Sequence, residues 1–371
     1  MRFTCEKALL QNAITTTGRA VAVKTSIPAL EGILIEAIGF LRLTGYNLET
    51  GIQSMVNADI QEEGTLVLSA KLLGEIVRKL PDELVTVSSQ GLTVKLDCGQ
   101  SHYTLQAIDP DEFPELPHVE GENELVMAQG NLKKMISQTI FAVSTQDIRP
   151  VHTGALFEVE NDSLTVVSLD GFRLALRREK YQKNLGDEHY TFVVPAFALS
   201  EVEKICAETD EPISITQGPA HVLFTIGETI VVSRRLEGDF LNYKQSIPKE
   251  NKINVVGATR DLLTSIGRVS LILSDKLKNP LRCTFRENQL FITTKSAIGD
   301  ASDLCPLEGD GGGLEIGFDN RYLSDALRFA PSDRVRLELS SPVTPCVILP
   351  PEENDDSFLY LVLPVRLKAG D

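Results

Sequence analysis

The sequence predicts an α+β fold built from three tandem copies of one domain, each with two helices packed on antiparallel sheet. The main observation is a repeat, because segments with helical periodicity recur about 125 residues apart. A period of this length indicates whole domains rather than the short units of a solenoid. The first helix of each copy is predicted at 6–19, 131–142 and 260–270, the second at 70–80, 195–207 and 321–329, and β-rich segments follow at 84–107, 213–235 and 335–367.

Local signals justify the boundaries of these elements. Ser69 is a suitable N-cap for the second helix of the first copy, and Pro81 ends that helix. Pro195 suits the first turn of the corresponding helix in the second copy. Short alternating apolar segments separated by Gly and Asn turns predict the strands. The acidic, glycine-rich stretch 307–313 is predicted to be an exposed loop, and its acidic residues argue against phosphate binding.

The length of 371 residues accommodates three domains, which we place at 1–123, 124–250 and 251–371. Each is large enough to bury its own core. No apolar run is long enough for a membrane helix, and the opening residues lack the apolar core of a signal peptide. A cytoplasmic protein is therefore expected, with no membrane partner.

The titratable and metal-binding residue types indicate neither a metal nor a cofactor. The six cysteines contain no CxxC pair, and the five histidines lack the spacing of zinc ligands. The cysteines are expected to be reduced and mostly buried. The net charge of −16 argues against nucleic acid, yet the helical segments together are basic and the remainder is strongly acidic. Helix propensity alone also explains a surplus of Lys and Arg in helices.

Several motifs occur in the order and spacing of a known family. They are SIPAL at 26–30, LTGYNLE at 43–49, QDIR at 146–149, LDGFRLA at 169–175, FLNY at 240–243 and YLVLPVRL at 360–367. Together with the triplication, they make the chain resemble the bacterial DNA polymerase III beta subunits, the sliding clamps. The resemblance implies a head-to-tail homodimer, a ring of six similar domains whose helices line a hole for duplex DNA. It also implies a non-catalytic protein whose partners are the polymerase III alpha subunit, a clamp-loader ATPase and other proteins with a clamp-binding motif.

The candidate DNA contacts come from two sources. The resemblance implies a contact at Lys24 and in the loop that carries Gln146 and Arg149. Charge and helix placement add Lys7, Lys71, Arg78, Lys133 and Lys134. For each lysine, a solvated surface position is an equal alternative to a phosphate contact.

The resemblance further implies a pocket for client peptides between the second and third domains. An apolar slot there would accept a Leu or Phe anchor, with two arginines on its rim. Leu361 and Leu363 are also compatible with ordinary strand core. Leu169, Phe172 and Gln245 differ from common family choices, so the peptide preference is open. The pocket residues are His152, Leu169, Gly171, Phe172, Arg173, Leu174, Leu241, Leu361, Leu363, Pro364, Val365, Arg366 and Leu367.

A ring requires contact between the first domain of one subunit and the third domain of its partner. The candidate interface residues are apolar and are equally compatible with intradomain core: Leu72, Ile76, Leu80, Leu271, Ile272 and Leu273. A head-to-tail contact must close on itself, because otherwise it builds a filament.

Three other interpretations stay open. Asp170 with His152 would suit an acid/base pair, but no nucleophile motif, nucleotide loop or metal cluster accompanies them. A paralogue that confers resistance to a clamp-directed inhibitor would keep both the ring and the pocket. A three-domain binding scaffold that never closes would be monomeric. The last four residues, 368–371, are predicted to form a disordered tail.

Overall fold

The computed structural model describes residues 1–121, 123–146, 149–273 and 279–367, so the predicted tail at 368–371 lies outside the described residues. Its contacts divide the chain into two compact units, each of which combines separate segments. Unit 1 consists of Met1–Lys133, Tyr181–Asp187 and Phe197–Arg235; unit 2 consists of Lys134–Lys180, Glu188–Ala196 and Leu236–Asp371. The second sequence copy contributes strands to both units. The boundaries at 123 and 250 therefore stay predictions from sequence.

Unit 1 holds two antiparallel sheets. The smaller has the order β5 (Asp59–Glu62), β1 (Arg2–Glu6), β7 (Leu84–Gln90), β8 (Thr93–Cys98) and β9 (Ser101–Gln106). The larger has the order β14 (Lys183–Leu185), β10 (Asn123–Ala128), β16 (Pro212–Gln217), β17 (His221–Ile226), β18 (Thr229–Arg234), β4 (Thr50–Val56), β3 (Phe40–Tyr46), β2 (Gly32–Ile38) and β6 (Gly64–Ser69). Because β18 pairs with β4, one continuous sheet joins strands of the first and second copies.

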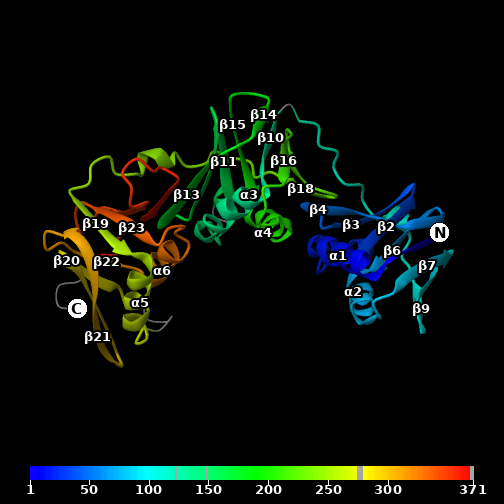
Figure 1. Cartoon of the computed structure of the whole chain (residues 1–371), viewed down its shortest axis with the longest axis horizontal. Helices are drawn as coiled ribbons and strands as arrows, with labels where there is room; N and C mark the ends of the chain where they lie inside the picture. Colours follow the sequence, from blue (N-terminus) through cyan, green and yellow to red (C-terminus); the bar gives the residue numbers. More distant parts are fainter. Residues whose placement is uncertain (122, 147–148, 274–278, 368–371) are drawn as a thin grey trace. The chain divides into compact units, whose positions relative to one another are not determined.

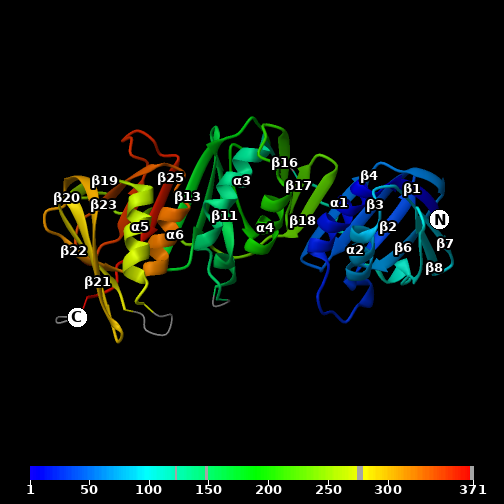
Figure 2. The same cartoon turned by 60° about the horizontal axis from the view of Figure 1, so that its bottom comes forward.

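The helices of the first copy are α1 (Lys7–Thr17) and α2 (Ala70–Lys79), which lie side by side in unit 1 (Figures 1 and 2). Each presents an apolar stripe to the core, with Leu10 and Ile14 from α1 and Leu73 and Val77 from α2 buried. Ser69 caps α2 as predicted, since its hydroxyl accepts a hydrogen bond from the backbone N–H of Leu72.

Unit 2 holds one eleven-stranded antiparallel sheet. Two helices pack against it side by side, α5 (Thr259–Ser270) and α6 (Asn320–Arg328) (Figures 1 and 2). The pairing of β13 with β25 joins strands of the second and third copies. The strand order is β15 (His189–Pro195), β11 (Gly154–Glu160), β12 (Ser163–Leu169), β13 (Arg173–Lys180), β25 (Phe358–Val362), β24 (Cys346–Leu349), β23 (Arg334–Leu339), β19 (Ile253–Ala258), β21 (Gly299–Asp310), β20 (Leu281–Ser296) and β22 (Glu315–Phe318).

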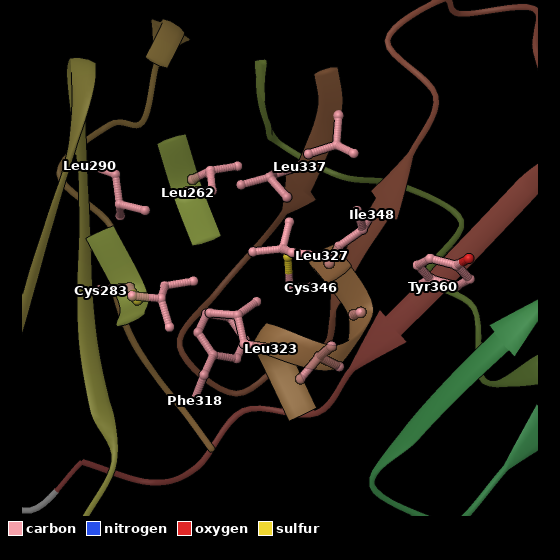
Figure 3. Close-up of a cluster of buried hydrophobic side chains, with 14 of the residues drawn as sticks. Leu262, Cys283, Leu290, Phe318, Leu323, Leu327, Leu337, Cys346, Ile348 and Tyr360 are labelled. Atoms are coloured by element: carbon pink, nitrogen blue, oxygen red, sulfur yellow. The ribbon is translucent and has the colours of Figure 1, made fainter. Parts of the chain in front are cut away.

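The core of unit 2 lies between the two helices and the sheet. Figure 3 shows Leu323 and Leu327 of α6 among side chains of the strands, with Cys346 and Ile348 close by. The thiol of Cys283 is fully buried in this cluster, and burial raises its pKa to about 12. All six cysteines are buried, in agreement with the prediction that most of them would be, and none forms a disulfide. They act here as small apolar side chains.

Several predicted helix boundaries in the second copy were wrong, since the helix predicted to end at 142 ends at Ser137 and a separate 3-10 helix covers Ile140–Ala142. Helix α3 (Gln129–Ser137) begins two residues before the predicted start at 131, because the Gln129 carboxamide accepts a hydrogen bond from the N–H of Ala207 at 3.1 Å. The next residue, Gly130, lies so close to Thr209 that a side chain would meet its carbonyl at 3.1 Å. Pro195 ends β15 opposite Gly154, and α4 (Ala196–Ile205) begins one residue later.

The prediction of an exposed loop at 307–313 was wrong for the first half of this stretch. Leu307 is buried and packs in the core of unit 2, so the chain continues as strand β21 to Asp310. The burial of Leu307 stabilises the extended backbone more than the glycines and acidic residues around it destabilise a strand. Among the described helices, none is long and apolar enough to cross a membrane.

Candidate functional site

A tight turn between β12 and β13 organises the site in unit 2. Gly171 has φ of +89°, a value that favours glycine, and this allows the chain to reverse. The Asp170 carboxylate accepts hydrogen bonds from the backbone N–H groups of Phe172 at 2.9 Å and Arg173 at 3.0 Å. The carbonyl of Phe172 accepts a hydrogen bond from the N–H of Leu363 at 2.9 Å. The turn is thereby fixed to the segment that follows β25.

Arg173 connects this turn to helix α6. Its guanidinium donates to Asp170 at 3.0 Å and to Asp325 of α6 at 2.7 Å. The same group lies over the ring of Tyr322 at 4.8 Å and over that of Phe141 at 5.5 Å. With 13% of its side chain exposed, the arginine is held by two carboxylates and two aromatic faces. Asp170 is therefore a structural partner of Arg173, with no acid/base contact to His152 in the described geometry.

Beneath the turn lies an apolar cluster that contains several predicted pocket residues. Leu169, Leu174 and Leu361 are buried in it together with Val151 and Tyr243. Strand pairing brings these leucines together, because Leu174 of β13 lies directly opposite Leu361 of β25. These three leucines form the floor rather than the open surface of the site.

The exposed part of the site, here called the rim, consists of side chains that lie close in the chain to this cluster or to residues packed against it. The side chains of Phe172, Leu241 and Val365 are 57%, 42% and 37% exposed, although all three are apolar. Leu363, Pro364 and Leu367 are half-buried, and Gly171 and Arg366 are exposed. Exposed apolar side chains gathered over an apolar floor are typical of a binding surface for a short peptide.

A hollow of about 230 Å³ opens beside Phe172, on its α6 side. Only Phe172, Arg173 and Gln146 of the predicted site residues line it. Sequence reasoning missed Tyr322, whose ring stacks on that of Phe172 at 5.9 Å, and Asp325. Both lie in the second helix of the third copy, about 150 residues from the turn, so no local pattern indicated them.

His152 sits at the edge of the apolar cluster. Its side chain is buried and meets the ring of Phe240 edge-on at 5.3 Å. Burial, with a smaller contribution from the charge of Arg149, holds the pKa of His152 below its ordinary value of 6.5. The folded protein therefore favours the neutral imidazole.

Folding stability should fall as the pH drops through 6.5, because the unfolded chain then takes up a proton that His152 in the folded protein resists. The contribution is fully present above pH 6.5. Thermal unfolding of wild type and His152→Gln at pH 7.5 and 5.5 measures it, and we expect a smaller loss for the variant. His189→Gln, at an exposed position, is the matched control. Equal losses for wild type and His152→Gln would contradict the assignment.

The residues predicted to contact DNA fall into both units. In unit 1, Lys24, Lys71 and Arg78 are exposed. Lys71 and Arg78 also line a groove of about 280 Å³ between α1 and α2, together with the polar side chains of Gln11 and Thr15. In unit 2, the described loop residues Gln146 and Arg149 are exposed, as is Lys134 of α3. These positions suit a solvated surface and a phosphate contact equally.

Two lysines of the predicted set have intramolecular partners. The ammonium of Lys7 donates to Asp82 at 2.8 Å, and only 14% of its side chain is exposed. Lys133 donates to the carbonyl of Cys206 at 3.0 Å, where a cation stabilises the carbonyl end of α4. Both contacts favour a structural role over a phosphate contact.

The predicted interface residues separate into exposed and buried groups. Leu72 and Leu271 are 47% and 81% exposed, which is unusual for leucine. Ile76 and Leu80 are buried in the core of unit 1, in agreement with the alternative of intradomain core. Ile272 and Leu273 are half-buried, and Leu273 packs against the core of unit 2.

The described residues contain no group of three or more His, Cys, Asp or Glu side chains that could hold a metal ion. The site consists of apolar and aromatic side chains around a fixed turn, which Arg173 joins to Asp170 and Asp325. Such a surface binds other molecules by shape, apolar contact and charge.

Comparison with known proteins matches the whole chain to one family. Three family models match in order: the N-terminal domain of the DNA polymerase III beta subunit at 1–117, the central domain at 126–242 and the C-terminal domain at 244–366. The beta sliding clamp of Halalkalibacterium halodurans is 32% identical over 383 residues, which cover 99% of this chain and 100% of the relative.

Solved structures agree with this match. The DNA polymerase sliding clamp of Bacillus subtilis has a TM-score of 0.93 and 30% identity, covering 99% of this chain and 100% of that one. The DNA polymerase III beta subunit of Thermotoga maritima has a TM-score of 0.91 and 27% identity with the same coverage. The three-domain clamp fold predicted from sequence is thereby confirmed. This chain belongs to the DNA polymerase III beta subunit family.

Proposed function

We propose that this protein is a DNA sliding clamp, a non-catalytic ring that encircles duplex DNA and tethers a DNA polymerase. The observation that carries the proposal is a repeated junction between copies. In unit 1 the last strand of the second copy, β18, pairs with β4 of the first copy. In unit 2 the last strand of the third copy, β25, pairs with β13 of the second copy. The same construction is thus used twice.

Two strand edges, one in the first copy and one in the third, correspond to the edges that pair at the internal junctions. Strand β9, the last of the first copy, lies at the edge of its sheet. In the third copy, the first half of β21 corresponds to β4 of the first copy and β13 of the second. Within the described chain, this half of β21 pairs on one side only, with β20. Open strand edges are ready to pair with another chain. We propose that β9 of each subunit pairs with β21 of its partner, so that two subunits close a ring.

We take the register of the proposed pairing from the two internal junctions. Thr229, the first residue of β18, lies opposite Ser54, the fifth residue of β4. Phe358, the first residue of β25, lies opposite Arg177, the fifth residue of β13. The same register places the start of β9 opposite Asp303, and hence His102 opposite Ser302 of the partner subunit.

The exposed cations Lys24, Lys71, Arg78, Lys134 and Arg149, with Gln146, are the proposed DNA contacts. Attraction to phosphates of this kind is independent of sequence and weakens with salt, which suits a protein that moves along DNA. The rim over the apolar cluster in unit 2 is the proposed site for a client peptide from the polymerase III alpha subunit and other partners with a clamp-binding motif. Opening of the ring is assigned to a separate clamp-loader ATPase.

The proposal is tested by loading and retention on DNA after disulfide closure of the ring. A variant with His102→Cys and Ser302→Cys is expected to cross-link into dimers under mild oxidation, because opposed positions bring Cβ atoms within disulfide reach. The control pairs His102→Cys with Asp300→Cys, which is displaced by two residues and should cross-link poorly. Since the six native cysteines are buried, they contribute little background.

Loaded by a clamp loader with ATP, the clamp should stay on nicked circular duplex in high salt and leave linear duplex by its ends. Cross-linking after loading should make retention on the circle resistant to denaturant. Equal loss from both substrates, or a monomer at all concentrations, would contradict the ring and favour a binding scaffold.

A further inference from the structure

The second helix of every copy repeats one pair of charges. Its sixth residue is acidic and its ninth residue is basic, a spacing of three that brings side chains together on a helix. The repeated pairs are Glu75 and Arg78 in α2, Glu201 and Lys204 in α4, and Asp325 and Arg328 in α6. In α4 and α6 the two charges lie 2.7 Å and 3.3 Å apart.

In unit 1, the acid of α4 also has a partner from the preceding copy. Arg19 lies 3.5 Å from Glu201, whose side chain is only 7% exposed. Arg19 is the thirteenth residue counted from the start of α1. Glu201 therefore has a cation from its own helix and a second one from across the junction.

Unit 2 repeats this arrangement with different residues. Asp325 of α6 accepts a hydrogen bond from Arg173, the first residue of β13 in the preceding copy. The thirteenth residue counted from the start of α3 is Phe141, and its ring stacks on Phe329 at the end of α6 with 4.8 Å between centroids. At both internal junctions, the second helix therefore meets the thirteenth position of the first helix, and its acid meets a cation.

Glu75 of α2 is the third acid of this set, and the copy that precedes it in a ring is the third copy of the partner subunit. There, the thirteenth residue counted from the start of α5 is Leu271, and the first residue of β21 is Gly299. Neither side chain carries a positive charge. Glu75 is exposed, and within the described chain no salt bridge to it is recorded.

We propose that the junction closing the ring has no arginine at either of the two positions that supply one at the internal junctions, and that Glu75 weakens this junction by facing Leu271 of the partner subunit. The inference rests on the proposed ring. When the ring closes, the carboxylate of Glu75 is placed beside the apolar side chain of Leu271. Partial loss of its hydration costs free energy, which an arginine opposite Glu75 would offset. Lys71, Arg78 and Lys79 of the same helix supply only part of this compensation, because they are exposed to solvent. The contact at Glu75 therefore contributes less to closing the ring than the matched contacts of Glu201 and Asp325 contribute to the internal junctions.

The decisive measurement is subunit exchange and dimer dissociation of the full chain with Glu75→Gln. We expect exchange to slow and the dissociation constant to fall by about 3- to 10-fold, the size of one partly exposed charge interaction at each junction. Glu63→Gln, an exposed glutamate on another segment, is the control for net charge and should change neither quantity. Weaker association of Glu75→Gln would overturn the inference, because it would mean that Glu75 has a cationic partner in the dimer. Unchanged association would also overturn it, because it would mean that Glu75 does not make the proposed contact.

A second set of variants tests the same point without relying on one substitution. Leu271→Arg supplies a cation at the position of Arg19, and a double-mutant cycle with Glu75→Gln isolates its coupling to Glu75. Favourable coupling of about threefold or more is expected, and zero coupling would overturn the inference. The same chemical change at the internal junctions, Glu201→Gln or Asp325→Asn, should instead lower the melting temperature. A wild-type protein that is monomeric at every concentration would remove the ring itself, which distinguishes failure of the proposed function from failure of this inference.

Discussion

Leu271→Glu is expected to convert the proposed head-to-tail dimer into monomers at micromolar concentration. Leu271 is 81% exposed in the single chain and lies where the internal junctions place Arg19 and Phe141 against a neighbouring helix. A carboxylate there would face Leu72 and Glu75 of the partner subunit, so it adds both desolvation and repulsion. Because a head-to-tail dimer contains the junction twice, the effect counts twice. We expect the dissociation constant to rise by about 100-fold or more, roughly 3 kcal/mol.

Sedimentation velocity over a range of concentrations measures this change, and loss of retention on circular DNA should accompany it. Val343→Glu is the matched control, since Val343 is 69% exposed in unit 2 and belongs to no proposed contact. A Leu271→Glu protein that sediments as a stable dimer would mean that the subunits meet through another surface.

Leu241→Asp is expected to abolish capture of client peptides while leaving the ring intact. Leu241 belongs to the exposed rim, is 42% exposed, and follows Phe240, which packs against the apolar cluster. A peptide anchor seated there would meet a carboxylate in place of apolar contact. Central apolar contacts of short peptides are worth about 2 kcal/mol or more, so affinity should fall by at least about 30-fold.

Fluorescence anisotropy with a labelled peptide carrying the clamp-binding motif of a polymerase III alpha subunit measures this loss. Leu92→Asp is the control, because Leu92 is an apolar turn residue of similar exposure, 40%, in unit 1. Unchanged peptide affinity in Leu241→Asp would exclude the rim as the client site. Loss of the dimer in the same variant would show that the substitution acts through folding.

The sequence was most informative where a local signal and a buried face coincide. Helix α2 was predicted to within one residue, since Ser69 and Pro81 mark its ends and its apolar residues keep one stripe. Helix α3 was placed less well because its start depends on contacts with 207–212, far along the chain. The stretch from Leu307 reads as a loop by composition, and only the tertiary core makes it a strand.

The same distinction applies to the candidate site. The motif at 169–175 indicated pocket residues by resemblance, and the structure adds the turn at 170–173 and the hydrogen bonds that hold it. Tyr322 and Asp325 were missed because packing of α6 against that turn is a long-range contact. The apolar stripe of a helix also does not indicate whether its own domain or another surface will cover it. Ile76 and Leu80 face their own core, whereas Leu72 on the same helix is exposed.

The sheet shared by the first two copies bears on how this protein is made. Strand β4 finishes at Val56, but its neighbour β18 begins only at Thr229, about 170 residues later. At synthesis rates of roughly 5–20 residues per second, the edge of β4 stays open for on the order of ten seconds or more after it leaves the ribosome. An open edge can pair with another nascent chain. The core of the first copy is formed by its own residues, but its larger sheet is complete only when the second copy has been translated.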